Sequence, residues 1–189
     1  MTRREDELQR TLQEGIYGTP ELKPEEKRLY LGEFRERVIA AIRFKQLSDN
    51  FIKEQVEEQL QMYGVKVMKF HHDVLYEQMK DYVTLAERYK VAYTTVNDAE
   101  YKREYAIVLA SDHAVDKADI VLKTEREQLL ARGVPEAIID AAGEDLCDDC
   151  RAIVSEKAPE ILRRYGDLNV LERIVGKRCA ACDATGRRM

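Results

Sequence analysis

Two matched cysteine pairs are the feature that most restricts how this sequence can fold. The first pair is Cys147-Asp-Asp-Cys150, and the second, after 28 intervening residues, is Cys179-Ala-Ala-Cys182. Each C-x2-C segment places two sulfurs on one tight turn, and zinc prefers four such ligands arranged as a tetrahedron. Because all four cysteines of the chain fall in these pairs, we expect one structural Zn²⁺ per chain, bound by Cys147, Cys150, Cys179 and Cys182.

The alternatives to zinc are disulfides, a redox pair or iron–sulfur cluster, and unliganded thiols. The chain starts with Met1-Thr-Arg-Arg-Glu-Asp-Glu, and no hydrophobic segment of the kind found in a secretory signal follows. No apolar run approaches the ~20 residues of a membrane span. We therefore expect a cytoplasmic protein without membrane association. In a reducing cytoplasm, paired cysteines are metal ligands sooner than disulfides, so the zinc interpretation is preferred.

The C-terminal third of the chain also needs such a crosslink. Residues 124–189 are too few and too charged to build a large apolar core. The binding free energy of a structural zinc, on the order of 10 kcal/mol in small peptides, becomes folding free energy. Lys177 and Arg178 lie beside the second cysteine pair and can offset the negative charge of a zinc tetrathiolate. We expect two domains, residues 1–123 and a zinc-binding domain at residues 124–189.

Hydrophobic periodicity predicts an α/β fold for residues 1–123. Short apolar or β-branched runs at 65–70, 91–96 and 106–110 are typical of strands, and the last is apolar on both faces, as a central strand would be. Helices are predicted from Ser48 or Asp49 to Leu60 and over 72–90, where Leu75 and Met79 belong to the apolar face. A strand, a long helix and a second strand imply a parallel crossover. Residues 35–47 fit a helix or a strand equally well.

Residues 124–189 show helical patterns and no strand signal. Pro159 is either a kink or the start of a new helix. Asp167 can cap a last helix that ends at Gly176. We therefore expect this zinc-stabilised domain to be all-α.

Charge and motifs exclude some classes of function. The formal net charge is −5, whereas proteins that grip many phosphates non-specifically usually carry a basic surplus. General DNA binding is therefore not expected. The sequence contains no Gly-rich phosphate loop, nucleophile elbow or metalloprotease helix.

Three segments give the N-terminal region a family resemblance. They are Gly15-Ile-Tyr-Gly-Thr-Pro20, Glu25-Glu-Lys-Arg-Leu-Tyr-Leu-Gly-Glu-Phe-Arg-Glu-Arg-Val38 and Leu109-Ala-Ser-Asp-His-Ala-Val-Asp116. In this order, over about residues 6–122, the chain resembles the YueI-like family of uncharacterised bacterial proteins. The resemblance implies a small α/β sandwich of the chorismate-mutase-like type, with a four-stranded mixed sheet, and makes residues 37–44 a strand. The C-terminal four-cysteine module is an addition to that family domain.

Two groups of residues are candidate contacts for a ligand or partner. Arg35 and Arg37 could bind an anion or an RNA phosphate, although a solvated, ion-paired helix end is the simpler interpretation. Asp112 and His113 follow the predicted central strand, where His113 could act as an acid or base oriented by Asp112 or Asp116. A turn stabilised by the aspartates is the simpler interpretation of that segment.

A third cluster, His71-His72-Asp73, could supply metal ligands. Adjacent residues at a helix start point in different directions, so a capping role for Asp73 is the preferred interpretation. The leading functional hypothesis is a non-enzymatic adaptor that binds a protein or a specific RNA. The alternative is a small-molecule enzyme or sensor that uses the Asp112/His113 strand edge with Arg35 or Arg37.

Overall fold

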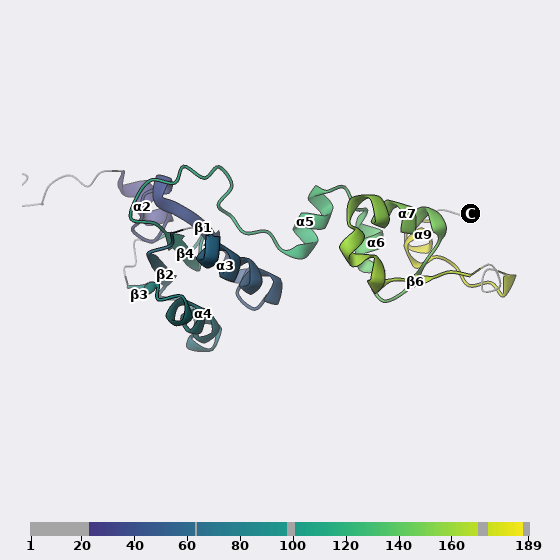
Figure 1. Cartoon of the computed structure of the whole chain (residues 1–189), viewed down its shortest axis with the longest axis horizontal. Helices are drawn as coiled ribbons and strands as arrows, with labels where there is room; N and C mark the ends of the chain where they lie inside the picture. Colours follow the sequence, from purple (N-terminus) through teal and green to yellow (C-terminus); the bar gives the residue numbers. More distant parts are fainter. Residues whose placement is uncertain (1–22, 63, 98–100, 170–173, 187–189) are drawn as a thin grey trace, which may run out of the picture. The chain divides into compact units, whose positions relative to one another are not determined.

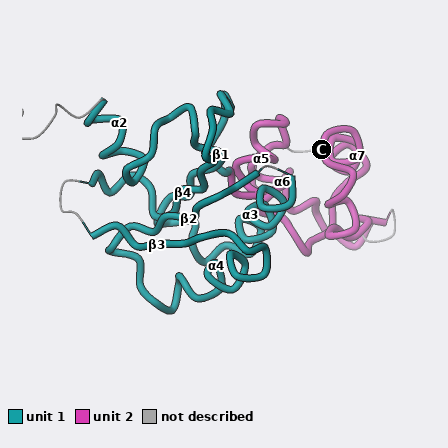
Figure 2. Tube along the Cα trace, turned by 60° about the vertical axis from the view of Figure 1, so that its left-hand side comes forward, with its two compact units in different colours: residues 1–122 teal, residues 123–189 magenta. Residues whose placement is uncertain are grey.

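The structure is a computed structural model that describes residues 23–62, 64–97, 101–169 and 174–186 (Figure 1). The chain divides into two compact units, unit 1 (Met1–Leu122) and unit 2 (Lys123–Met189), which are coloured separately in Figure 2. The family-like segment at residues 15–20 lies outside the described residues. Among the described residues, no helix is both long enough and apolar enough to span a membrane.

Unit 1 contains a four-stranded mixed sheet. Its strands are β1 (Val38–Ile42), β2 (Val67–His71), β3 (Ala92–Val96) and β4 (Ile107–Ala110), in the order β1-β4-β2-β3. Strands β2 and β3 are parallel, and β4 runs antiparallel to both of its neighbours. The predicted strands, the parallel crossover and the interior position of the fourth strand are therefore confirmed.

The ambiguous segment at residues 35–47 is a strand, as the family resemblance implied. All five residues of β1 are buried, because both faces of the strand are covered. A 3-10 turn precedes it at Arg35–Arg37, and another follows at Phe44–Gln46. These turns explain the mixed periodicity, since one-turn helical segments border a strand that is apolar on both sides.

Two helices of unit 1, α3 (Asn50–Met62) and α4 (Tyr76–Arg88), pack against one face of the sheet. Their apolar side chains meet Met68, Phe70 and Leu109 in the main core. Helix α4 begins later than predicted, and Leu75 is its extended N-cap residue with 66% of its surface exposed. The prediction that Leu75 belongs to the apolar face, and that Asp73 caps the helix, is therefore wrong.

The other face of the sheet carries a smaller apolar cluster around Leu31, Val38 and Tyr105. The short helix α2 (Pro24–Leu29) leads into it. Leu31 has a positive φ of 54° and is followed by Gly32 with a φ of 85°. This left-handed pair turns the chain tightly enough for Leu31 to be fully buried.

Unit 2 is built from short elements. Its helices are α5 (Glu125–Ala131), α6 (Glu136–Asp140), α7 (Asp148–Lys157) and α9 (Ala180–Ala184), with a 3-10 helix at Pro159–Arg164. Thr124 caps α5 in a capping box with Glu127. Pro159 starts the 3-10 helix, as one of the two predicted alternatives had it.

The prediction of an all-α domain at residues 124–189 is wrong. Strands β5 (Asp145–Leu146) and β6 (Gly166–Asp167) form a small parallel sheet. Its bonds include those from the Gly166 amide to the Glu144 carbonyl at 3.0 Å and from the Leu168 amide to the Leu146 carbonyl at 3.2 Å. Strands of two residues are too short to show alternation in the sequence. Asp167 lies in β6 and caps no helix there, and residues 170–173 of the predicted last helix lie outside the described residues.

Candidate metal centre

The two cysteine pairs occupy equivalent positions on two helices. Cys147 is the N-cap of α7 and Cys179 is the N-cap of α9. The second cysteine of each pair lies three residues later, in the first helical turn. This geometry turns the two sulfurs of a pair to the same side, and backbone amides at a helix start favour a thiolate. Strand β5 leads directly into Cys147 and so places the first pair.

The sulfur atoms of the four cysteines lie close together. The Sγ atom of Cys182 lies 3.8 Å from that of Cys147 and 3.6 Å from that of Cys150. The ligand atoms of Cys147, Cys150, Cys179 and Cys182 all lie within 4.8 Å of one another. All four are free thiols. Two sulfurs bound at 2.3 Å to one tetrahedral zinc would lie about 3.8 Å apart, so the donor set fits a tetrahedral metal site.

The cluster is part of the core of unit 2. Cys147, Cys150 and Cys179 are buried, and they pack with Leu146 and Val154 among other apolar residues. Burial raises the pKa of the Cys150 thiol, and it raises the pKa of Cys182 to about 11. Burial also acts to raise the pKa of Cys179, but hydrogen bonds with the backbone of Cys147 and Cys182 and with the side chains of Cys147 and Cys150 outweigh it and hold that pKa at about 7.

The two cations beside the second pair have carboxylate partners. The Lys177 ammonium forms an ion pair with Asp145, and the Arg178 guanidinium lies 3.4 Å from Asp183. Asp145 immediately precedes the Leu146–Cys147 segment, so the first of these ion pairs joins the two cysteine-bearing segments. Lys177 therefore helps to position these two segments. Its predicted role in offsetting the charge of a zinc tetrathiolate stays a prediction.

Asp112 and His113 lie together at the end of β4. The Nδ1 atom of His113 is 2.8 Å from an Asp112 carboxylate oxygen and 2.9 Å from the Ser111 hydroxyl. Both side chains are mostly exposed, and His113 chiefly holds the pKa of Asp112 below its usual range. Both partners contact the same ring nitrogen, so the three residues form no relay of the catalytic-triad type, in which opposite nitrogens are used.

The two candidate arginines have structural contacts. The Arg35 guanidinium donates to the backbone carbonyls of Lys117 at 2.6 Å and Ala118 at 2.9 Å. The Arg37 guanidinium lies over the Phe34 ring, 5.9 Å from its centroid. Arg35 therefore ties the family-like segment before β1 to the loop after β4.

His71, His72 and Asp73 converge, against the expectation that they point in different directions. The His71 and His72 rings stack with centroids 4.4 Å apart, and an Asp73 carboxylate oxygen lies 3.3 Å from His72 Nε2. The turn after β2 folds the three side chains together. However, the Nδ1 atom of His71 accepts a hydrogen bond from the Asp73 amide at 3.1 Å, and Arg103 pairs with the Asp73 carboxylate at 3.3 Å. Both contacts compete with a metal ion.

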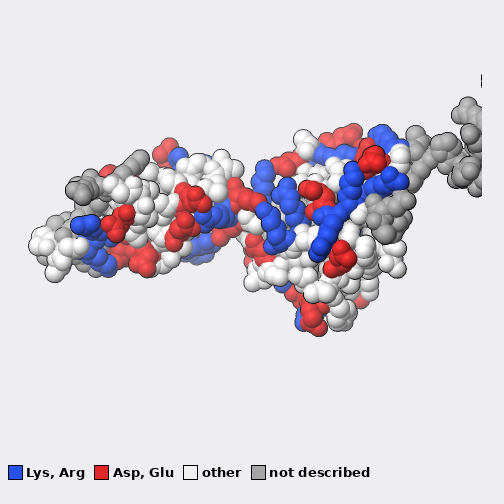
Figure 3. Space-filling model, turned by 180° about the vertical axis from the view of Figure 1, so that it is seen from behind, with Lys and Arg blue, Asp and Glu red and all other residues white. Residues whose placement is uncertain are grey.

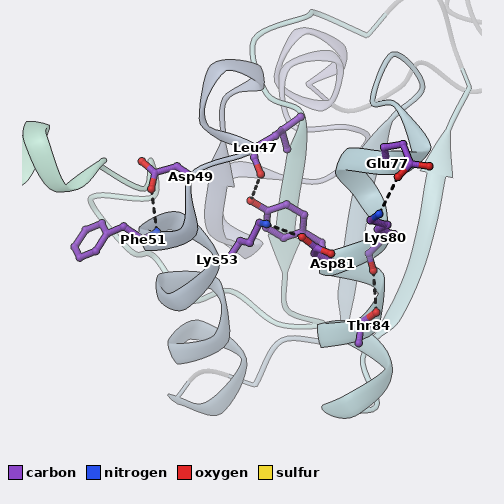
Figure 4. A network of polar contacts seen from close by, with 9 residues as sticks. Leu47, Asp49, Phe51, Lys53, Glu77, Lys80, Asp81 and Thr84 are labelled. Carbon is purple, nitrogen blue, oxygen red and sulfur yellow. Dashed lines mark hydrogen bonds and ion pairs between the residues drawn. The ribbon is translucent and has the colours of Figure 1, made fainter.

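A polar groove of about 400 Å³ between α3 and α4 was not predicted from the sequence. Lys53 of α3 reaches Asp81 of α4 across it at 2.5 Å (Figure 4). The buried Tyr82, next to Asp81 in α4, donates to the Leu47 carbonyl at 2.9 Å. Arg88 and Glu57 form a second ion pair along the groove at 3.0 Å. The lining residues come from two separate helices, so only their packing reveals the groove.

Known proteins match the first two thirds of the chain. The family described as "Protein of unknown function (DUF1694)" matches residues 5–121. The "Uncharacterized protein YueI" of Bacillus subtilis (strain 168) is 31% identical over 121 residues, which are 64% of this chain and 92% of that protein. The crystal structure of the YueI protein from Bacillus subtilis gives a TM-score of 0.51 at 30% identity, covering 64% of this chain and 94% of that one. The family match ends before the first cysteine.

Proposed function

This chain belongs to the DUF1694 family, and we propose that it is a non-enzymatic binding protein whose unit 2 is built on one structural zinc. This proposal rests on the close approach of the four thiols, in which the Sγ atom of Cys182 lies 3.6 Å from that of Cys150 and 3.8 Å from that of Cys147. Four cysteine ligands fill a tetrahedral zinc and leave no position for a water or substrate. Soft thiolate donors favour zinc over magnesium or calcium. The zinc therefore crosslinks the chain and supplies no chemistry.

The proposed partner is a protein or a specific RNA. On the face drawn in Figure 3, Lys and Arg side chains gather over unit 1 with Asp and Glu side chains among them. A mixed surface of this kind, on a chain of net charge −5, supports a selective partner rather than general binding to DNA. The contacts of Arg35 with two backbone carbonyls support a structural role for that residue in preference to substrate binding.

The proposal also includes the fold type of unit 1 and the cellular compartment of the protein. The mixed sheet with α3 and α4 on one face supports a sandwich of the chorismate-mutase-like type for unit 1. Free thiols at all four cysteines support a reducing compartment such as the cytoplasm.

The test is a capture experiment with the full-length, zinc-loaded chain. The tagged protein is crosslinked in a bacterial lysate with its total RNA, and retained species are identified by sequencing and mass spectrometry. A Cys150→Ser, Cys182→Ser variant shows which partners need unit 2, and Thr84→Ala is the surface control. An RNA or protein retained reproducibly and competed by untagged protein supports the proposal. No enriched partner of either kind would overturn it.

The alternative is a small-molecule enzyme or sensor at the end of β4. Its support is the pair of contacts from Asp112 and Ser111 to Nδ1 of His113, which orient the ring and leave its Nε2 atom for a ligand. A metabolite collection is screened by the shift in the melting temperature of unit 1. A compound that stabilises the wild type but neither Asp112→Asn nor His113→Gln would replace the adaptor hypothesis with this one.

A further inference from the structure

The two edge strands of the sheet in unit 1 differ in whether another segment of the chain pairs with them. At the β1 edge, the Ala41 amide donates to the Ile120 carbonyl at 2.7 Å, and the Leu122 amide donates to the Ala41 carbonyl at 3.1 Å. Residues 120–122 therefore cover that edge. At the opposite edge, β3 pairs with β2, and no other segment among the described residues pairs with it.

The register identifies the backbone groups that β3 presents outward. The Ala92 amide donates to the Lys66 carbonyl at 3.1 Å, and β3 pairs with β2 without a break from Ala92 to Val96. In a parallel pair, the amide and carbonyl of one residue face the neighbouring strand and those of the next residue face away. Tyr93 and Thr95 therefore turn their amides and carbonyls to the open edge. A row of such groups is a template for another strand.

Nothing in the sequence of β3 opposes such pairing. Ala92-Tyr-Thr-Thr-Val96 contains no charge and no proline, which are common means of protecting an edge strand. The first four of these residues are exposed. Leu75 and Tyr76, at the start of α4, are 66% and 73% exposed, and the Tyr76 phenol is close enough to influence the pKa of Tyr93. Exposed apolar surface thus accompanies the open edge, where Figure 2 shows α4 beside β3.

The side chains of β3 alternate between two environments. The Tyr93 phenol donates to Glu87 at 3.1 Å and the Thr95 hydroxyl lies 3.9 Å from the Met79 sulfur, so both side chains lie on the α4 side. Thr94 points to the other face and is exposed. A substitution at Thr94 therefore leaves the contacts with α4 and the backbone bonds to β2 in place.

We propose that two copies of this chain pair through β3, antiparallel and centred on Thr94, so that their two sheets become one. The strand is self-complementary in this register. The outward groups of Tyr93 meet those of the partner's Thr95, and those of Thr95 meet the partner's Tyr93, which forms four backbone hydrogen bonds. Thr94 faces the partner's Thr94 in a pair whose Cβ atoms lie about 5 Å apart. Two uncharged threonines meet there without repulsion, which favours a second copy over a charged peptide.

The test uses opposite charges at the centre of the proposed pair. The full-length wild type, Thr94→Lys and Thr94→Glu are each measured by sedimentation velocity over a concentration series. The wild type is expected to dimerise, and each variant to be monomeric because like charges then face each other. An equimolar mixture of the two variants is expected to regain the dimer. Thr84→Lys, an exposed substitution on α4, is the control and should dimerise like the wild type.

Amide hydrogen exchange provides an independent readout. In the dimer, the amides of Tyr93 and Thr95 should exchange more slowly as the concentration of the wild type rises, and this dependence should be absent in Thr94→Lys. A wild type that is monomeric over the whole series would overturn the proposal. A dimer that persists in both charge variants would also overturn it, because the contact would then lie elsewhere.

Discussion

The cores of unit 1 and unit 2 consist of different kinds of side chain. In unit 1, five consecutive residues of β1 are fully buried, and Phe70 of β2 and Tyr82 of α4 lie together in the main apolar core. In unit 2, three of the four cysteines are themselves buried in the core, beside Leu146 and Val154. Unit 1 is therefore held by apolar packing between a sheet and two long helices, whereas buried thiols lie within the core of unit 2.

The helices of the two units also differ in length. Helices α3 and α4 of unit 1 each have 13 residues, whereas α9 and α6 of unit 2 have 5 each. Isolated helices shorter than about 12 residues are marginal in water. Elements as short as those of unit 2 need a crosslink to stay folded, and the four thiols lie where such a crosslink would hold α7, α9 and β5 together.

The largest expected effect follows from removing one thiol. Cys182→Ser should unfold unit 2 and leave unit 1 intact, because three ligands cannot replace a binding free energy on the order of 10 kcal/mol. Limited proteolysis with mass spectrometry should show cleavage spread over residues 123–189 and a resistant fragment from unit 1. Thr185→Ala, which removes the hydroxyl that bonds the Ala181 carbonyl at 3.1 Å, is the matched control and should keep both units resistant. An intact unit 2 in Cys182→Ser would contradict the proposal that a metal crosslink holds this unit folded.

The converse change is a cavity in the core of unit 1. Phe70 is fully buried on β2, and Phe70→Ala should lower the free energy of unfolding of unit 1 by about 3–5 kcal/mol. Unit 2 should keep its metal, because the cysteines lie in a separate core. Urea unfolding followed by tyrosine fluorescence measures the first effect, and metal content after dialysis measures the second. Loss of metal from Phe70→Ala would show that the two cores depend on each other.

An intermediate effect is expected at Arg35. Arg35→Ala removes the two hydrogen bonds to the carbonyls of Lys117 and Ala118, and should cost unit 1 about 1–3 kcal/mol. Thermal unfolding of this variant and of Arg37→Ala distinguishes the two arginines, because the Arg37 guanidinium lies over the Phe34 ring. Equal melting temperatures for Arg35→Ala and the wild type, with weaker RNA binding, would favour the phosphate-contact hypothesis instead.

The smallest effect is a pH dependence confined to unit 1. Burial is the main cause that lowers the pKa of His71, with a further lowering by His72, whereas Asp73 acts in the opposite direction. The unfolded chain therefore binds a proton more readily than the native one as the pH falls below 6.5. The free energy of unfolding should decrease from that pH downward and level off below the native pKa.

The variant His71→Asn tests this assignment. An asparagine side-chain oxygen can still accept the Asp73 amide hydrogen bond that the Nδ1 atom of His71 accepts at 3.1 Å, but it does not titrate. Urea unfolding of unit 1 at several pH values should show a flatter curve below pH 6.5 than in the wild type. An unchanged curve would assign the pH dependence to other groups.

Much of this structure could be predicted where the signal is local. The spacing of Cys147 and Cys150 sets both sulfurs at one helix start, and with two such pairs a common site was the simplest arrangement. The buried run at Ile107–Ala110 likewise indicated an interior strand. The strand at Val38–Ile42 needed the family resemblance, because its flanking 3-10 turns add helical periodicity to the sequence.

The features that escaped prediction depend on contacts between distant residues. Arg35 binds the carbonyl of Lys117, 82 positions away, and no pattern in the sequence reports such a contact. Strands β5 and β6 have two residues each and exist only because the folded chain brings them together. The convergence of His71 and Asp73 depends on the turn that follows β2, which residue spacing does not specify.

The proposed zinc site in unit 2 is tested by measuring metal content and structure together on the full-length chain. Metal content is determined by mass spectrometry, a thiol-competing chelator then removes the metal, and amide hydrogen exchange is followed before and after. We expect one zinc per chain, and on its removal a loss of protection in residues 123–189 with unchanged protection of β1, β2 and β4. A unit 2 that keeps its protection without metal, or a native chain purified without zinc, would contradict it.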